Sequence, residues 1–200
     1  ISPTPDRCLY SYKDIIASIS NLANQINSKF HNKEIVFAPV MTGSLVFAGH
    51  LLPLLNHKVL HINYLHYSRY IDNNGIENGH WIYKPSRDEV LNKHVLLIDD
   101  ILDEGKTLFE CVSTLKKLGA KTVASCVLFY KPNTKTKIDA DFKGLEVPNL
   151  YVYGFGLDNK GIERNHVNLY AQSDYAYFYG AGTSTSADEV PGVRPFSPEP

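Results

Sequence analysis

Four carboxylates gather where an apolar run of the sequence ends. In VLLIDDILDEGKTL, residues 95–108, four aliphatic residues lead directly to Asp99 and Asp100, and Asp103 and Glu104 follow. Two ionised carboxylates side by side repel each other, and partial removal from water increases the repulsion. Such a pair is tolerable where it accepts hydrogen bonds from hydroxyls or faces a cation. A ribose has two adjacent hydroxyls, so Asp99 and Asp100 predict a sugar site.

The residues after the carboxylates predict a phosphate site. Asp103 and Glu104 lead through Gly105 into an apparent helix start. The beginning of a helix offers free backbone N–H groups and a partial positive charge to an anion. Gly105 lets the backbone approach the anion closely, and Thr107 adds a hydroxyl donor. A sugar site beside a phosphate site predicts a ribose 5-phosphate as the ligand.

Three other interpretations of the same stretch are weaker. Gly-Lys-Thr also ends a P-loop, but a P-loop requires glycine at position 100, which is Asp100. A receiver-type phosphoacceptor pocket also uses an acidic pair after a strand, but after the first strand of its domain, whereas this predicted strand is the third. A solvated surface loop explains one or two carboxylates, but not all four.

The elements that position these residues are predicted from apolar periodicity. Ser11 and Asp14 form a potential capping box for a first helix, whose apolar face recurs at helical spacing: Ile15, Ile19, Leu22, Ala23, Ile26 and Phe30. A second helix is predicted from Leu45 and a third up to Gly119. Strands are predicted at residues 34–40, 59–64, 95–98, 122–130 and 150–155. Strands that alternate with helices and have no polar face predict an α/β fold, with a mostly parallel central sheet flanked by helices.

Two segments differ from this pattern. Residues 66–92 are polar, contain two Asn-Gly pairs and interleave tyrosines and a tryptophan. A connection of that length is usually functional or mobile, so we predict a long loop that closes over the site. Residues 181–200 are rich in Gly, Ser, Thr and Pro, which predicts a flexible or artificial tail after a single domain at residues 1–180.

Composition excludes several classes of partner. The 20 Lys and Arg residues nearly balance the 21 Asp and Glu residues, for a net charge of −1, which predicts neither a nucleic-acid nor a membrane surface. Cys8, Cys111 and Cys126 are too scattered for a metal site or a disulfide framework. Cys111 and Cys126 fall in apolar patterns, so we expect buried thiols and a cytoplasmic, reducing compartment.

Residues 95–108 closely resemble the phosphoribosyl-diphosphate signature of the type I phosphoribosyltransferases. Residues 40–44 (VMTGS) resemble the diphosphate-binding loop of that family. Residues 129–132 (FYKP) and 150–158 (LYVYGFGLD), followed by Arg164, resemble the purine-binding segments of the hypoxanthine-guanine branch. The resemblance covers about residues 5–172. It implies the type I fold, with a small hood lobe and a long mobile loop.

The resemblance implies a role for each matching residue. Asp99 and Asp100 would bind the ribose hydroxyls, one of them through Mg²⁺, and Asp103 would act as acid or base at the imidazole nitrogen of the purine. The 5-phosphate would be held by Glu104, Gly105, Lys106 and Thr107, and the diphosphate by Met41, Thr42, Gly43, Ser44 and Arg164. Lys131 would donate to the 6-oxo oxygen, Tyr151 would stack on the base, the Val152 backbone would meet its edge, and Asp158 would bind a second Mg²⁺. Arg69 and Tyr70 would close over the diphosphate.

The sequence departs from the family pattern at three places, one of which is the mobile loop, which often carries Ser-Tyr but here has Ser68-Arg69-Tyr70. The diphosphate loop often contains Lys-Gly-Gly, but this chain has Thr42-Gly43-Ser44, so backbone amides must replace the lysine charge. Asp99 stands where Glu is common.

The implied activity is transfer of the 5-phosphoribosyl group from phosphoribosyl diphosphate to hypoxanthine or guanine, in a homodimer or homotetramer. Two alternatives stay open: a preference for xanthine, and a non-catalytic regulator that senses phosphoribosyl diphosphate. The regulator could lose Asp103, Lys131 or Asp158 without cost, whereas this chain has all three.

Overall fold

The computed structural model describes residues 6–56, 59–71, 77–132 and 138–172. The predicted tail at residues 181–200 lies outside the described residues. The elements are β1 (Arg7–Tyr10), α1 (Tyr12–Lys29), β2 (Ile35–Pro39), α2 (Leu45–Leu51), the 3-10 helix η1 (Leu52–Leu54), β3 (Val59–Ile62), β4 (His66–Ile71), β5 (Glu77–Tyr83), α3 (Arg87–Val90), β6 (His94–Leu102), α4 (Lys106–Lys117), β7 (Thr122–Tyr130), β8 (Phe142–Glu146), β9 (Val152–Tyr153) and β10 (Leu169–Ala171).

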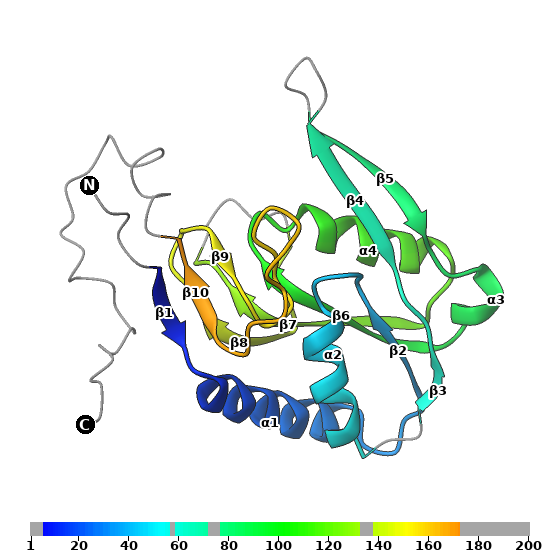
Figure 1. The fold of residues 1–200 in the computed structure, drawn as a ribbon. Helices are drawn as coiled ribbons and strands as arrows, with labels where there is room; N and C mark the ends of the chain where they lie inside the picture. The colour runs from blue at the N-terminus through cyan, green and yellow to red at the C-terminus, as the bar shows by residue number, and fades with distance from the viewer. Residues whose placement is uncertain (1–5, 57–58, 72–76, 133–137, 173–200) are drawn as a thin grey trace, which may run out of the picture.

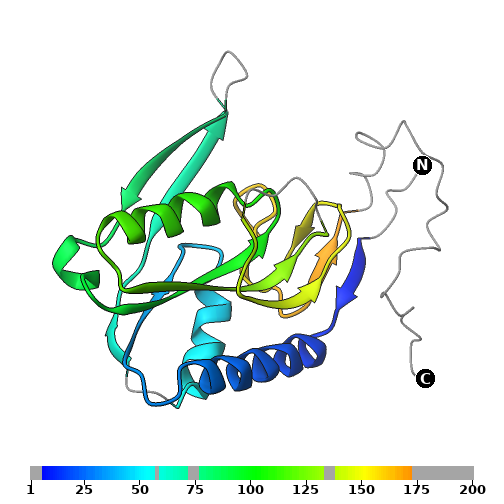
Figure 2. The ribbon, with the colours of Figure 1, turned by 180° about the vertical axis from the view of Figure 1, so that it is seen from behind.

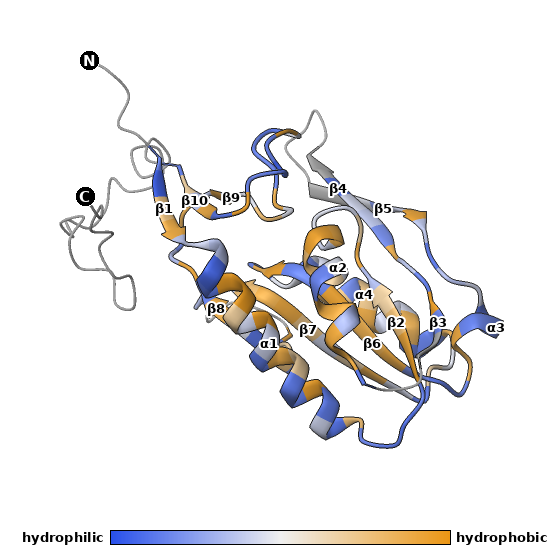
Figure 3. Ribbon diagram, turned by 60° about the horizontal axis from the view of Figure 1, so that its bottom comes forward, coloured by the Kyte–Doolittle hydropathy of each residue, from blue (hydrophilic) through white to orange (hydrophobic). Residues whose placement is uncertain are grey.

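A five-stranded parallel sheet forms the centre of the molecule (Figure 1), in the order β3-β2-β6-β7-β8. Helices α1 and α2 cover one face and α4 the other, as the view from behind shows (Figure 2). The apolar residues of α1 and of the inner strands face one another (Figure 3). The predicted α/β fold with a parallel sheet and flanking helices is therefore confirmed.

Local sequence explains the ends of the first helix. The Ser11 hydroxyl accepts from the Asp14 backbone amide, and the Asp14 carboxylate accepts from the Ser11 backbone amide, so the predicted capping box is present. The predicted apolar face is buried throughout, from Ile15 to Phe30. The long helix packs against the sheet because burial of this stripe removes its apolar surface from water.

A second, smaller sheet forms the predicted hood lobe. It has the strand order β1-β10-β9, all antiparallel, and lies beyond the β8 edge of the main sheet (Figure 1). Residues 150–155 were predicted as the fifth strand of the central sheet, and this is wrong: β9 belongs to the hood. The fifth central strand is β8, which pairs with β7.

The segment predicted as a long loop is partly ordered. Strands β4 and β5 pair as an antiparallel hairpin, and α3 follows, so residues 66–71 and 77–90 are not a structureless connection. The alternating tyrosines and tryptophan are the reason, because aromatic residues pair well across strands. Tyr67 and Trp81 stand opposite each other with their rings 5.0 Å apart.

Burial of the thiols agrees with the sequence. Cys111 and Cys126 are free and buried, and burial raises the pKa of both. Across the part of the chain that the structure describes, none of the helices has the length and apolar character needed to cross a membrane.

Candidate active site

The carboxyl ends of three adjacent strands, β2, β6 and β7, meet at one edge of the sheet, where ligands of open α/β sheets bind. A cavity of about 420 Å³ opens there. It brings together predicted site residues from five separate segments: Met41, Thr42, Arg69, Asp99, Asp100, Asp103, Glu104, Gly105, Lys106, Thr107, Asp158 and Arg164. Segments that are distant in the sequence therefore form one polar cavity.

Other predicted residues lie outside the cavity lining. Ser44 is fully buried and its hydroxyl donates to the Val40 carbonyl (2.6 Å), while Val152 belongs to the core. Gly43, Lys131 and Tyr151 stand directly behind lining residues, as the contacts below show. The Tyr70 side chain lies outside what the structure describes. Several lining residues received no role from the sequence: Val40, His66, Tyr67, Ser68, Ile101, Leu102 and Leu108. Four of them lie within the matched motifs at residues 40–44 and 95–108, whereas the only signal for residues 66–68 was their aromatic and polar character.

Asp99 and Asp100 lie inside β6, not beyond its end as the sequence suggested. The strand continues to Leu102 because pairing with β7 extends to Leu102–Tyr130. Asp99 is 6% exposed. Burial and the neighbouring Asp100 carboxylate raise the pKa of Asp99 well above its usual range, and burial also raises the pKa of Asp100. The cavity therefore holds two carboxylates that need a cation or hydroxyl donors to be comfortably ionised.

The buried Asp99–Asp100 pair should lower the stability of the folded protein at neutral pH, where both carboxyls would carry charge. A carboxyl whose pKa is raised on folding favours the folded state below its unfolded pKa, and this contribution is lost as pH rises through the folded pKa. Asp99→Asn is neutral at every pH, so it should melt above wild type at pH 7, by about 2–4 °C for each kcal/mol of repulsion removed. The gain should shrink as the pH falls toward the ordinary aspartate pKa of roughly 3.9.

Melting curves of both proteins from pH 4 to pH 8 measure this effect. Asp139→Asn is a control of opposite sign, because a hydrogen bond from Lys143 lowers the pKa of Asp139, and its loss should lower the melting temperature slightly at pH 7. An Asp99→Asn protein that is no more stable than wild type at pH 7 would show that the pair is not strained.

The loop from Met41 to Ser44 connects β2 to α2 beside Asp100. Its first residue is held by a hydrogen bond from the Met41 amide to the Leu65 carbonyl (2.7 Å), and its Met41–Thr42 peptide bond is cis. At Gly43 an added Cβ would lie 1.7 Å from Asp100 Oδ2, so a side chain has no space there. The glycine allows the loop to pass directly over the Asp100 carboxylate.

Helix α4 points its first turn at the cavity. Its N-cap residue is Gly105, with φ of 74°, and no side chain caps the helix. The first turn of a helix is a favourable site for an anion, because its backbone amides have no partner within the helix. A carboxylate at Glu104 would oppose a phosphate, but Glu104 Oε2 lies 2.7 Å from Lys106 Nζ and 3.7 Å from Arg69 Nη1, which offset its charge.

Asp103 and Lys131 form an ion pair at the edge of the cavity. Lys131 Nζ lies 2.7 Å from Asp103 Oδ2, and the lysine side chain is only 11% exposed. The strand register brings them together. Leu102 and Tyr130 are paired at the ends of β6 and β7, and Asp103 and Lys131 are the residues that follow them. An ammonium has three N–H donors, so Lys131 can hold Asp103 and donate to a ligand at the same time.

Asp158 and Arg164 meet across a tight loop that starts in the hood. Arg164 Nη2 lies 3.1 Å from Asp158 Oδ1, and Arg164 Nη1 donates to the Gly156 carbonyl (2.8 Å). The Tyr151 hydroxyl donates to the Asp158 carbonyl (2.9 Å). The predicted base-stacking residue thus also holds the backbone of a predicted metal ligand.

The donor set fits a divalent cation that arrives with its substrate. Within the described ranges, no group of three or more His, Cys, Asp or Glu side chains is placed to hold a metal ion alone. Mg²⁺ commonly uses one or two carboxylates and takes its other ligands from water and substrate phosphates. Asp99, Asp100 and Asp158 are hard oxygen donors on one cavity, and a cation would relieve the repulsion that raises the pKa of Asp99.

Comparison with known proteins gives a consistent result. Residues 9–160 match the model of the phosphoribosyl transferase domain family. The chain is 31% identical over 170 residues to a hypoxanthine-guanine phosphoribosyltransferase of Aquifex aeolicus, covering 84% of this chain and 95% of that protein. It is 28% identical over 157 residues to a hypoxanthine phosphoribosyltransferase of Buchnera aphidicola, covering 76% and 87%. A hypoxanthine phosphoribosyltransferase structure from Staphylococcus aureus superimposes with a TM-score of 0.76 at 26% identity, covering 86% and 93%.

Proposed function

Because this chain belongs to the phosphoribosyltransferase family, we propose that it transfers the 5-phosphoribosyl group from phosphoribosyl diphosphate to hypoxanthine or guanine in purine salvage. The products are the purine nucleotide and diphosphate. The bond between the anomeric carbon and diphosphate breaks, and a purine nitrogen forms the new bond to that carbon.

The 2.7 Å contact between Asp103 and Lys131 is the observation that carries the choice of base. On a 6-oxopurine the 6-oxo oxygen and N7 are adjacent on one edge, so the groups that contact them must also be neighbours. Lys131 would donate to the oxygen while Asp103 exchanges a proton at the imidazole nitrogen. Adenine would point an amino donor at the ammonium, which disfavours it.

The acidic cavity supports the sugar half of the reaction. As diphosphate leaves, the anomeric carbon gains positive charge, and nearby carboxylates stabilise that charge. Asp99 and Asp100 would accept hydrogen bonds from the ribose hydroxyls, and the first turn of α4 would hold the 5-phosphate. Met41, Thr42, Arg69 and Arg164 line the same cavity, and they would orient the diphosphate.

We further propose Mg²⁺ as the divalent cation, held by Asp99, Asp100 and Asp158. It would supply positive charge to the departing diphosphate. The β4–β5 hairpin would help to exclude water, which would otherwise hydrolyse the sugar.

A mixing assay tests the function. Purified protein, phosphoribosyl diphosphate and Mg²⁺ are incubated separately with hypoxanthine, guanine, xanthine and adenine, and nucleotide formation is followed. Product from hypoxanthine or guanine supports the proposal, and a marked preference for xanthine would replace it with the first alternative. Binding of phosphoribosyl diphosphate without product from any base would support a regulator instead.

The Tyr151 hydroxyl gives a separate prediction. Tyr151→Phe keeps the aromatic ring for stacking but removes the hydrogen bond to the Asp158 carbonyl. We expect KM for phosphoribosyl diphosphate to rise by about two- to tenfold, the value of one net hydrogen bond, with little change in KM for the base. Tyr153→Phe is the matched control, because it removes a 2.8 Å hydroxyl bond to Asp6 in the hood. A rise in the base KM alone would show that the hydroxyl serves the purine.

Three further statements are proposals from the sequence. We propose a homodimer or homotetramer from the family resemblance, a cytoplasmic location from the expected buried thiols, and a single domain at residues 1–180 from length and composition. Light scattering on the purified protein tests the first, and limited proteolysis tests the domain boundary.

A further inference from the structure

The β4–β5 hairpin contributes one part of the cavity lining, beside the main sheet and the loops that carry Met41 and Asp158. His66, Tyr67, Ser68 and Arg69 of β4 all line it. The Arg69 charge also lowers the pKa of Asp99, against the larger effects of burial and Asp100. Because the hairpin is a separate two-stranded sheet, its direction over the cavity depends on how its two ends are attached.

The end that leads into β4 is attached through its backbone. The Asn63 amide donates to the Phe37 carbonyl (3.0 Å), and the Leu65 amide donates to the Pro39 carbonyl (2.9 Å), so the chain stays beside β2. The Leu65 carbonyl accepts from the Met41 amide (2.7 Å). This end of the hairpin is therefore hydrogen-bonded to the Met41–Ser44 loop, which passes over Asp100.

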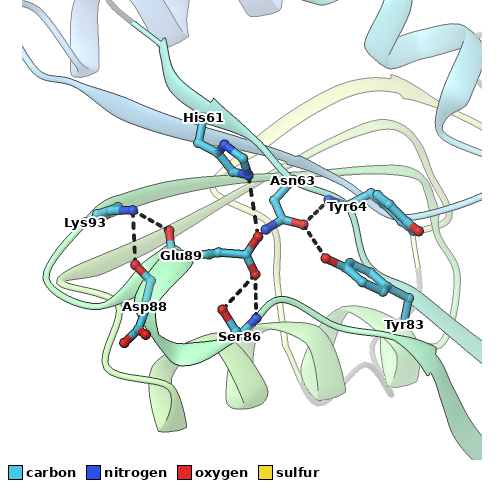
Figure 4. Close-up of polar contacts among 8 residues, drawn as sticks. All are labelled: His61, Asn63, Tyr64, Tyr83, Ser86, Asp88, Glu89 and Lys93. Carbon is cyan, nitrogen blue, oxygen red and sulfur yellow. Dashed lines mark hydrogen bonds and ion pairs between the residues drawn. The ribbon is translucent and has the colours of Figure 1, made fainter.

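The end that leaves β5 is attached through the Tyr83 side chain. Tyr83 is the last residue of β5, and its hydroxyl donates to Asn63 Oδ1 (3.3 Å). Its ring stacks on Tyr64, with centroids 4.2 Å apart and planes at 22°. Figure 4 shows the two rings side by side, with the Asn63 carbonyl oxygen joined by dashed lines to the Tyr64 amide and the Tyr83 hydroxyl. We call Asn63, Tyr64 and Tyr83 the hairpin root.

The chain that follows the root is also pinned to β3. Glu89 Oε2 accepts from the Ser86 amide (2.7 Å) and hydroxyl (2.9 Å), which caps α3, while Glu89 Oε1 lies 3.6 Å from His61 Nε2 on β3 (Figure 4). Lys93 Nζ donates to the Asp88 and Glu89 carbonyls. Tyr83 thus joins the base of the hairpin to the sheet edge, in addition to the packing of Tyr67 and Trp81 against the core.

Burial of the Asn63 side chain costs free energy of folding. Asn63 is 3% exposed, and among the described residues its Nδ2 makes no hydrogen bond of strict geometry, although after Ser86 a looser contact from Asn63 also lowers the pKa of Glu89. A buried donor with a partner in poor geometry costs free energy, so an apolar side chain of similar size would pack at lower cost. What Asn63 provides is Oδ1, which accepts from both the Tyr64 amide (2.9 Å) and the Tyr83 hydroxyl.

We propose that Asn63 and Tyr83 are positioning residues, which aim the β4–β5 hairpin so that Arg69 and Ser68 reach the diphosphate end of the substrate. The inference rests on the proposed function for its kinetic consequence. Neither residue lines the cavity, so each acts through the hairpin. A register shift between His66 and Tyr67 gives this effect a local route, because a bulge redirects the side chains that follow it.

Tyr83→Phe tests the proposal, with Tyr64→Phe as its matched control. Both variants keep the stacked rings, but only Tyr83→Phe loses the bond to Asn63, since no described residue bonds to the Tyr64 hydroxyl. For Tyr83→Phe we expect KM for phosphoribosyl diphosphate to rise by about two- to tenfold, with little change in kcat or in KM for the base. Hydrogen–deuterium exchange of the hairpin strands should accelerate, whereas Tyr64→Phe should change neither property.

A double-mutant cycle guards against an unrelated loss of stability. Asn63→Leu removes the acceptor, so its effect on KM should not add to that of Tyr83→Phe. Additive effects, or a lowered melting temperature with no change in KM or exchange, would overturn the proposal. The exchange measurement needs no activity. Faster exchange in a protein that makes no nucleotide would therefore refute the proposed function while leaving the hairpin root intact.

Discussion

Asp103→Asn should reduce turnover by about a hundredfold or more, with little change in either Michaelis constant. An amide has almost the shape of the carboxylate but cannot carry a proton to or from the purine, and general acid–base catalysis contributes roughly 10²–10⁴-fold. The assay is steady-state nucleotide formation from the preferred base. Turnover close to wild type would remove Asp103 from its proposed role.

Asp103→Asn also breaks the ion pair with Lys131, so its effect on stability must be separated from its effect on turnover. Loss of the carboxylate leaves a mostly buried ammonium without its partner, which destabilises the fold, so the melting temperature should fall as well. Adding Lys131→Met in the same background should restore stability but not turnover. Asp139→Asn breaks a surface ion pair of 2.8 Å and should leave turnover unchanged. Recovery of turnover together with stability would mean that the pair serves the fold alone and that neither Asp103 nor Lys131 has its proposed role.

The local structure of residues 95–108 could be predicted from the sequence because the signals for it lie within that stretch. The apolar run predicted a buried strand, the carboxylates predicted a sugar, and Gly105 predicted a helix start with free amides. The structure confirms the strand and the helix start, and it places the carboxylates and Gly105 on one cavity. The first helix and strand β7 were equally readable, because capping residues and apolar periodicity encode them over short distances.

The strands that were predicted wrongly, β8 and β9, depend on contacts with residues distant in the sequence. Strand β8 has one fully buried residue in five, so it gives no apolar run to detect. Residues 150–155 do give such a run, but positive φ at Gly154, Phe155 and Gly156 turns the chain after Tyr153 and leaves β9 in the hood.

Contacts between residues on neighbouring strands also could not be predicted from the sequence. The Asp103–Lys131 ion pair requires β6 to lie beside β7 in one register, and the approach of Gly43 to Asp100 requires β2 to lie beside β6. Sequence spacing specifies neither neighbour. The base-recognition argument therefore became possible only with the structure.

Gly43→Ala should lower kcat/KM for phosphoribosyl diphosphate by about a hundredfold. The added Cβ would lie 1.7 Å from Asp100 Oδ2, and the carboxylate cannot easily retreat because Asp100 Oδ1 accepts from the Ile101 amide (2.7 Å). The loop must therefore move, and a displacement of roughly 1 Å in a substrate-binding segment can cost about 10²-fold. Gly49→Ala is the matched control: it lies in α2 with nothing within 4 Å of the new methyl group. It should leave activity unchanged and raise stability by about 0.5–1 kcal/mol.

The movement of the loop is also limited by Gly156, which packs closely against the Gly43 carbonyl. A Cβ at Gly156 would lie 2.2 Å from the Gly43 carbonyl oxygen, and Gly156 has φ of +103°, which an alanine adopts only with strain. Gly156→Ala should therefore weaken the same substrate and also lower the melting temperature, whereas Gly43→Ala should act mainly on binding. Wild-type kcat/KM in Gly43→Ala, beside a damaged Gly156→Ala, would show that the loop yields without consequence and that Asp100 does not depend on its position.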